Sequence, residues 1–169
     1  MARGFKQRKG IDFDLTYSPT LNIDGLKLII ALASKFKWNM IQLDIKAAYL
    51  NAHFEKDIYT TIPPGDPNFG KGYWMMNKAL YELKQSGSQW NITITKFLVN
   101  NGYHQLISEK CIFKRIIKNK LWALLVYTLM IYVITGEDKE IKRIVNIIKN
   151  NFKVSKVEPI NYILGIKID

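Results

Sequence analysis

The sequence has little cysteine and histidine, and this excludes several classes of site. Its 169 residues include one cysteine, Cys111, and two histidines, His53 and His104. One cysteine cannot form a disulfide framework or a cysteine-based zinc cluster, and two histidines leave little for a histidine-rich metal site. The N-terminal segment is polar and does not have the apolar stretch of a secretory signal. We therefore expect an intracellular location, in the cytoplasm or the nucleus.

Acidic residues are also few. There are 14 Asp and Glu against 25 Lys and Arg, which gives a formal net charge of +11. A positive excess of this size is typical of proteins that bind polyanions such as nucleic acid. The basic residues are 21 Lys and 4 Arg, alongside 24 Ile and 13 Asn. Because Lys, Ile and Asn all have AT-rich codons, the base composition of the gene is an equal alternative, and the basic surface would then simply be solvated.

The sequence lacks an apolar run long enough to span a membrane. The longest uncharged run, Leu121 to Gly136, covers 16 positions, whereas a spanning helix needs about 20 apolar residues. The run is rich in β-branched and aromatic residues, so it favours two buried strands and no membrane contact. With 48% hydrophobic residues, the chain is apolar enough to fold around a core.

Hydrophobic periodicity predicts an α+β fold in which strands outnumber helices. The expected helices are 23–37, 88–101 and 138–151. The expected strands are 40–45, 57–62, 111–117, 121–127, 131–135 and 160–168. Asn22 is positioned to cap the first helix, and Thr135 with Asp138 could form a capping box for the third. A loop rich in Pro and Gly follows Pro63.

Six short segments follow one another in a recognisable order. They are Ala-Arg-Gly-Phe-Lys-Gln with Gly-Ile-Asp-Phe-Asp and Tyr-Ser-Pro (2–19), Gln-Leu-Asp-Ile-Lys-Ala-Ala-Tyr-Leu-Asn (42–51), Pro-Pro-Gly (63–65), Asn-Lys-Ala-Leu-Tyr-Glu-Leu-Lys-Gln with Gln-Trp (77–90), Ser-Glu-Lys-Cys-Ile-Phe (108–113) and Tyr-Ile-Leu-Gly-Ile (162–166). Together they resemble the reverse transcriptase of copia-type retrotransposons, part of the Pol polyprotein. The resemblance spans nearly the whole chain.

This resemblance implies the fingers and palm of a right-hand polymerase, with a mixed, mostly antiparallel sheet packed on helices. Residues 1–169 would form a single partial domain. Its fingers-like parts would be 1–38 and 52–84, and its palm-like parts 39–51 and 85–169. We expect the thumb and RNase H regions, and a fingers strand that precedes residue 2, to be absent from this sequence.

The resemblance also implies an RNA-directed DNA polymerase that uses Mg²⁺ in a two-metal mechanism on a nucleic-acid template–primer. Asp44 would be a catalytic carboxylate and metal ligand, although a strand-terminal acid is the alternative. Tyr49 would lie under the nucleotide sugar and select deoxynucleotides, unless it is a half-buried core tyrosine. Gln85 would contact the incoming nucleotide and template, or be an ordinary polar loop residue. Lys78 and Lys84 would contact phosphates. The alternative, that they belong to a solvated basic face, is at least as well supported.

The sequence departs from the family at its second catalytic motif. Where the family has Tyr-Val-Asp-Asp on a hairpin, Leu129 and Met130 stand in place of the two acids. Neither side chain offers an oxygen ligand, and Glu137 and Asp138 lie too far along the next strand to substitute. Glu82 also replaces a usual glycine. We therefore expect a catalytically dead fragment. The alternatives are a non-catalytic nucleic-acid-binding remnant or, least favoured, a membrane-associated structural protein; the oligomeric state is not predicted.

Overall fold

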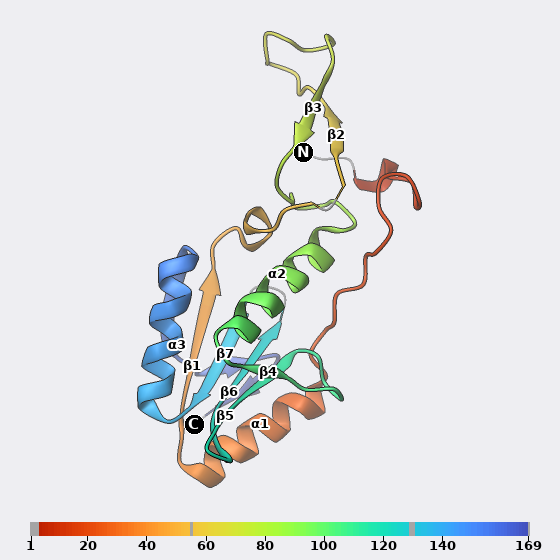
Figure 1. Ribbon diagram of the computed structural model, residues 1–169. Coiled ribbons are helices and arrows are strands. Elements are labelled where there is room, and N and C mark those ends of the chain that lie inside the picture. The colour runs from red at the N-terminus through yellow and green to blue at the C-terminus, as the bar shows by residue number, and fades with distance from the viewer. Residues whose placement is uncertain (1–3, 55, 129–130, 169) are drawn as a thin grey trace. The chain divides into compact units, whose positions relative to one another are not determined.

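The computed structural model describes residues 4–54, 56–128 and 131–168 (Figure 1). These residues form two compact units. The first combines the segment up to Ser18 with Ala47–Ile94, and the second combines Pro19–Lys46 with the segment from Thr95 onward. The units reflect packing and do not test the division into fingers and palm, which stays a prediction.

A six-stranded sheet forms the centre of the second unit. Its strands are β1 (Asn39–Ile45), β4 (His104–Gln105), β5 (Ile112–Ile117), β6 (Lys120–Thr128), β7 (Ile131–Gly136) and β8 (Val154–Pro159). They lie in the order β4-β5-β6-β7-β1-β8, and each neighbouring pair is antiparallel. The predicted α+β class with a mostly antiparallel sheet is confirmed.

One face of this sheet is covered by helix α1 (Ile23–Phe36). Its Leu26 and Ile29 pack in a cluster with Leu124, Val126 and Val133 of the central strands. The predicted N-cap is confirmed, because the Asn22 side chain accepts a hydrogen bond from the Asp24 amide at 3.1 Å. This cap satisfies one of the unpaired amides at the helix start. Two short strands, β9 (Tyr162–Ile163) and β10 (Ile166–Lys167), pair with each other and contribute Ile163 to the same cluster.

Helix α3 (Asp138–Asn151) packs against β6 and β7. Side chains alternate between the two faces of a strand, so Ile134 points away from the α1 cluster that Val133 joins. Ile134 is fully buried, which places α3 on this second face. The helix buries the apolar stripe that the sequence predicted, namely Ile141, Ile144, Val145 and Ile148.

A buried carboxylate fixes α3 to its neighbours. Glu140 lies 2.8 Å from Arg143 and 2.9 Å from Arg115 of β5, and it accepts a hydrogen bond from the Tyr103 hydroxyl at 3.2 Å. Burial, followed by the negative charge of Glu140, raises the pKa of Tyr103 well above its usual range. The pair of arginines compensates the one buried negative charge.

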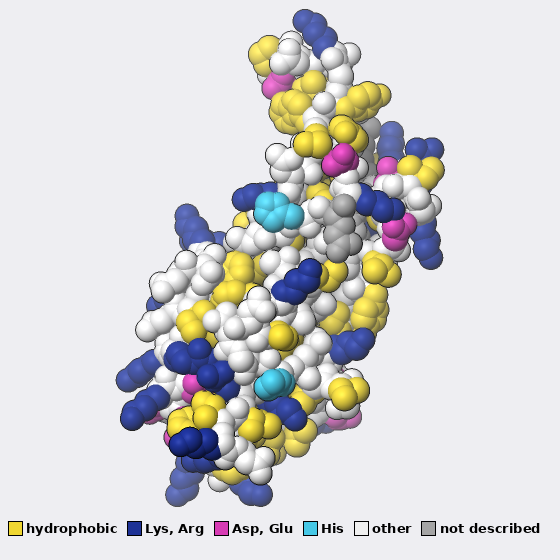
Figure 2. Space-filling view, viewed as in Figure 1, with side chains coloured by type: hydrophobic (Ala, Val, Ile, Leu, Met, Phe, Trp, Pro, Cys, Tyr) yellow, Lys and Arg dark blue, Asp and Glu magenta, His cyan; other side chains and the backbone are white. Residues whose placement is uncertain are grey.

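The first unit contains a β-hairpin and the start of a long helix (Figure 1). Strands β2 (Ile58–Thr61) and β3 (Tyr73–Met76) pair antiparallel, and helix α2 (Ser86–Asn100) begins in this unit and ends in the second. Short 3-10 turns lie at Gly4–Lys6 and Ala48–Asn51. Figure 2 shows hydrophobic side chains gathered over the hairpin, where one side is exposed and carries Tyr59, Tyr73 and Met75.

The predicted capping box at the start of α3 is wrong. The N-cap is Glu137, and its side chain makes no capping hydrogen bond. Thr135 is instead buried within β7, where its hydroxyl donates to the Asn39 carbonyl at 2.9 Å. The strand extends one residue further than its periodicity suggested, to Gly136, so the hydroxyl is used within the sheet.

The predicted strand 160–168 is also wrong as a single element. Leu164 and Gly165 both have positive φ angles, 45° and 83°, and separate β9 from β10. Strands β3, β4 and β8 were not predicted. The uncharged run that starts at Leu121 does form two strands, β6 and β7, as expected. Among the described residues no helix is both long enough and apolar enough to cross a membrane.

Candidate functional site

Asp44 lies near the end of β1, where it is held by the neighbouring edge strand. The Ser155 hydroxyl lies 2.6 Å from its Oδ2 atom and 3.1 Å from its backbone oxygen. The β1–β8 register shifts between Asp44 and Ile45, and just beyond this irregularity the Lys46 amide donates to the Lys153 carbonyl at 2.8 Å. The carboxylate is therefore half-buried and fixed by a hydroxyl donor.

The register of the sheet brings Asp44 to the start of β7. Asp44 is opposite Ile131, which in turn is opposite Thr128 at the end of β6. The two positions where the sequence predicts lost ligands, Leu129 and Met130, fall between these paired residues and lie outside the described part of the chain. The described residues on either side of these two positions, Thr128 and Ile131, thus lie at the level of Asp44 in the neighbouring strands.

The described residues around Asp44 do not fit a two-magnesium site. Magnesium requires several hard oxygen ligands in octahedral geometry. Nowhere in ranges 4–54, 56–128 and 131–168 do three or more His, Cys, Asp or Glu side chains gather to hold a metal ion. The residues opposite Asp44 in the sheet are Lys156 and Ile131, a cation and a hydrocarbon.

The acids that follow β7 lie at the far end of the sheet. Gly136, which precedes Glu137, pairs with Asn39 at the first position of β1. At about 3.3 Å per residue, the five residue steps from Asn39 to Asp44 correspond to about 17 Å. Glu137 therefore cannot complete a site at Asp44.

Gln85 belongs to the first unit, where its amide group is used internally. The side chain is buried, donates to the Asp12 carbonyl at 3.1 Å and accepts from the Gln7 amide at 3.0 Å. These bonds tie the N-terminal segment to the residue before α2. The amide keeps one N–H and one oxygen lone pair beyond these bonds, but the side chain is buried, so a nucleotide contact would require it to become accessible.

Lys84 also contacts the N-terminal segment. Its backbone amide donates to the Gln7 side chain at 2.9 Å, and its ammonium group donates to the Gln7 carbonyl at 3.2 Å. The ammonium group lies 5.0 Å from the centre of the Phe13 ring, within cation–π range. Lys78 and Lys84 are both exposed at the surface.

Tyr49 lies near the start of α2 in the same unit. Its ring centre is 5.1 Å from that of Tyr81, and a Cβ atom placed on Gly87 would be 4.0 Å from its hydroxyl. Burial and, secondarily, the neighbouring Tyr81 raise the pKa of Tyr49. The structure therefore brings Tyr49 near Gly87 in the first turn of α2, and Gly87 is two residues after Gln85. Asp44 belongs to the second unit.

The sequence did not predict the backbone conformation of Glu82 or the hydrogen bond of Ser155 to Asp44. Glu82 has a φ angle of 76°, in the left-handed region that favours glycine. The glycine that the family usually has there is the signal that could have revealed this conformation. Ser155 gave no signal, because it is 111 residues away from Asp44.

The chain belongs to the reverse transcriptase (RNA-dependent DNA polymerase) family, whose model matches residues 1–169. The mixed helices and antiparallel sheet of the chain are consistent with this family. Its relatives are Pol polyproteins of copia-type transposons.

The chain is 34% identical over 172 residues to "Retrovirus-related Pol polyprotein from transposon TNT 1-94" of Nicotiana tabacum. It is 29% identical over 170 residues to "Retrovirus-related Pol polyprotein from transposon RE2" of Arabidopsis thaliana. Both alignments cover 99% of this chain, but only 13% and 12% of the relatives. A yeast relative, "Transposon Ty1-ER2 Gag-Pol polyprotein" of Saccharomyces cerevisiae, is 32% identical over 65% of this chain and 7% of that protein. No solved structure matches the chain.

Proposed function

We propose that this chain is a reverse transcriptase segment of a copia-type element that has lost template-directed DNA synthesis. Asp44 is the one carboxylate that remains of the site, with Tyr49 and Gln85 on the nucleotide side and Lys78 and Lys84 on the nucleic-acid side. The proposal rests on a single observation. The segment that pairs beside Asp44 carries Leu129 and Met130 where the family has two aspartates.

The chemical reason is the number of oxygen ligands. Polymerases of this type hold two divalent ions about 3.5–4 Å apart, which bind the attacking and leaving oxygens. One carboxylate cannot hold two such ions beside a triphosphate, and thioether or hydrocarbon side chains do not bind Mg²⁺. The Ser155 hydroxyl beside Asp44 adds a single neutral oxygen.

Primer extension tests this proposal. We expect the purified chain to add no nucleotides to a primer on an RNA template with either Mg²⁺ or Mn²⁺. The control is the Asp44→Asn variant, which should give the same background. Incorporation by the unmodified chain that disappears in Asp44→Asn would show that the remaining carboxylate supports catalysis and would refute the proposal.

A second candidate function is binding of a template–primer without catalysis. The net charge of +11 and the exposed Lys78 favour it. Affinity for an RNA–DNA duplex should then fall steeply with salt, because each neutralised phosphate releases counterions. Lys78→Gln with Lys84→Gln should flatten that dependence. If the slope does not change, these lysines do not contact the duplex and the base composition of the gene is the better explanation.

The same proposal places the protein inside the cell, in the cytoplasm or the nucleus. Its one cysteine is a buried free thiol, and a free thiol is typical of proteins from reducing compartments. Microscopy of a tagged copy tests the location, and secretion into the medium would contradict it.

A further inference from the structure

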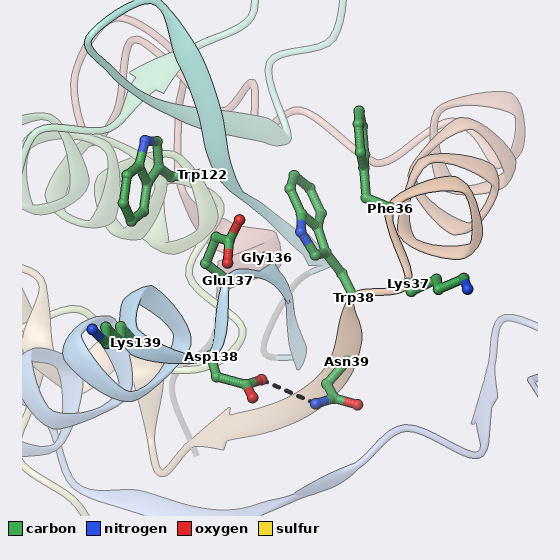
Figure 3. Close-up of a pocket in the computed structure, with 9 residues that line it drawn as sticks. All are labelled: Phe36, Lys37, Trp38, Asn39, Trp122, Gly136, Glu137, Asp138 and Lys139. Atoms are coloured by element: carbon green, nitrogen blue, oxygen red, sulfur yellow. Dashed lines mark hydrogen bonds between the residues drawn. The ribbon is translucent and has the colours of Figure 1, made fainter.

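The second unit has an open pocket at the end of the sheet remote from Asp44. Its volume is about 480 Å³, within the usual range for ligand sites. It is lined by residues from the end of α1, the start of β1, β6, the end of β7 and the first turn of α3 (Figure 3). Because Asn39 lines it and Asp44 is about 17 Å away along β1, this pocket is separate from the site described above.

Two indoles flank the pocket. Figure 3 shows Trp38 and Trp122 on either side of the segment that carries Glu137. Trp38 is stacked on Phe36 with ring centres 4.7 Å apart, and the Trp122 indole donates to the Ile117 carbonyl at 3.3 Å. Each ring is thus held in place while part of it remains accessible to solvent. Rigid, half-exposed aromatic rings are the platforms on which nucleic-acid bases stack.

The pocket is lined by two lysines and two acids. Lys37 and Lys139 line the rim and are exposed. The two acids already have partners, since Glu137 is paired with Lys120 at 3.1 Å and Asp138 accepts from the Asn39 amide at 3.0 Å. The Lys120 ammonium also lies 5.5 Å from the Trp122 ring.

A row of lysines continues from the pocket along α3. Lys139, Lys142 and Lys149 are exposed at helical spacing, and Lys153 follows the end of the helix. Figure 2 shows Lys and Arg side chains on the part of the second unit where α3 lies. Glu140, the one acid of α3 besides Asp138, is buried with its arginines. Lys139 lies in the first turn, where a cation opposes the helix dipole, whereas Lys149 lies in the last turn, where a cation favours it. Helix stability therefore does not explain Lys139, the residue of the row that lines the pocket.

We propose that this pocket and the lysine row bind single-stranded nucleic acid, RNA or DNA, with a base stacked on the Trp38 or Trp122 indole. The phosphates run past Lys37 and Lys139 and along α3. The carboxylate of Glu137 can accept hydrogen bonds from the exocyclic amino group of a stacked base. Aromatic platforms beside a basic track are the two elements of sequence-tolerant single-strand binding. The proposal does not depend on whether the chain synthesises DNA.

The test compares bases with backbone. The full chain is titrated into three fluorescent 12-unit oligomers, oligo(A) as RNA, oligo(A) as DNA, and an abasic DNA of the same charge, with binding followed by anisotropy. We expect the abasic strand to bind about tenfold more weakly than either oligo(A), because each stacked base contributes about 1–3 kcal/mol. The RNA and DNA arms show whether the 2′-hydroxyl contributes.

Two variants locate the site. Trp122→Leu should weaken oligo(A) binding about tenfold and leave abasic binding unchanged. Lys37→Gln with Lys139→Gln should weaken all three and lower the slope of log affinity against log salt by about 1.4, as expected for two lost phosphate contacts on a single strand. The matched control, Lys27→Gln with Lys110→Gln, removes the same charge from exposed positions elsewhere in the unit and should leave the slope unchanged.

Three outcomes would overturn the proposal. They are equal affinity for abasic and base-carrying strands, an oligo(A) affinity unaffected by folded Trp122→Leu, and a control pair that lowers the slope as much as the pocket pair. The first comparison uses the unmodified chain, so it decides the question even if a variant fails to fold.

Discussion

Glu82 has a backbone conformation that ordinary side chains avoid. At a φ of 76° its Cβ is crowded by its own backbone, which costs about 1–2 kcal/mol for a residue other than glycine. We predict that Glu82→Gly raises the free energy of unfolding by about 1 kcal/mol, measured by urea denaturation. Glu82→Ala is the control, because it removes the charge and keeps the Cβ. If both variants stabilise equally, the charge and not the backbone is responsible.

Cys111 should make the stability of the chain depend on alkaline pH. Burial and the nearby charge of Glu109 raise the pKa of this thiol to about 12, whereas an unfolded cysteine has a pKa of about 8.5. A raised folded-state pKa contributes stability that is complete below pH 8.5 and is lost as pH rises toward 12. We predict a loss of about 1 kcal/mol between pH 8 and pH 9.5 from this group.

The measurement is urea denaturation at the two pH values. Cys111→Ala cannot ionise and should lose less stability over that interval than the unmodified chain. An identical pH dependence in both proteins would mean that the thiol does not titrate differently on unfolding.

At the scale of elements, Glu140 joins three parts of the second unit. Its carboxylate contacts Arg115 on β5, Arg143 on α3 and Tyr103 after α2. We predict that Glu140→Gln lowers the free energy of unfolding by about 2 kcal/mol, less than for a fully buried pair because both arginines are partly exposed to solvent. Lys142→Gln, on the exposed side of the same helix, should change it by less than about 0.5 kcal/mol. Thermal unfolding monitored by circular dichroism measures both, and equal effects would contradict the role of the cluster.

The elements that sequence predicted well are those with a long apolar pattern. Helix α3 buries an apolar stripe, with Glu140 as its one buried charge, and β6 and β7 carry no charge apart from Lys120 at the first position of β6. Strand β8 was missed because Val154–Pro159 is an edge strand that alternates with charged residues, as edges often do. The strand 160–168 was misjudged because a left-handed residue, Leu164, interrupts it.

In the candidate site, too, local sequence patterns predicted some residues, whereas others are brought together only by the fold. Asp44 was predicted as a site residue because its neighbours in sequence resemble the family motif, and this role stays a prediction. The hydroxyl donor Ser155, and the internal hydrogen bonds of Gln85 with Gln7 and Asp12, depend on pairings between distant segments. No local pattern encodes such partners, so they require the fold.

At the scale of the whole molecule, we expect solubility to depend on one uncharged stretch and on exposed apolar side chains. The stretch from Leu121 to Thr135 has no charge, no proline and high β-propensity, which is typical of aggregation-prone segments. The β2–β3 hairpin adds exposed Tyr59 and Tyr73. We predict that the chain is poorly soluble, and that Leu129→Asp with Met130→Asp raises its soluble yield because charges interrupt such segments.

Soluble yield and the elution profile in size exclusion, for the proteins expressed side by side, measure this. Leu129→Asn with Met130→Asn is the control, since it adds polarity without charge and should give a smaller gain. A soluble, monodisperse unmodified chain, or a lower yield with the aspartates, would show that this run is not what limits solubility. We do not expect the aspartates to restore full polymerase activity.

The pairing of Thr128 with Ile131 limits how the gene can change. Only two codons lie between these partners, and a strand displaced by one residue turns every following side chain to the opposite face. Val133 and Ile134 are both buried, on opposite faces of the sheet. Insertion or deletion of a single codon between Thr128 and Ile131 would turn each of them to the face that the other occupies. Substitutions leave the length intact. In decaying copies of such an element, the catalytic residues can therefore be replaced while the spacing between Tyr127 and Tyr132 is retained. A comparison of copies should find many substitutions but few length changes in this hairpin.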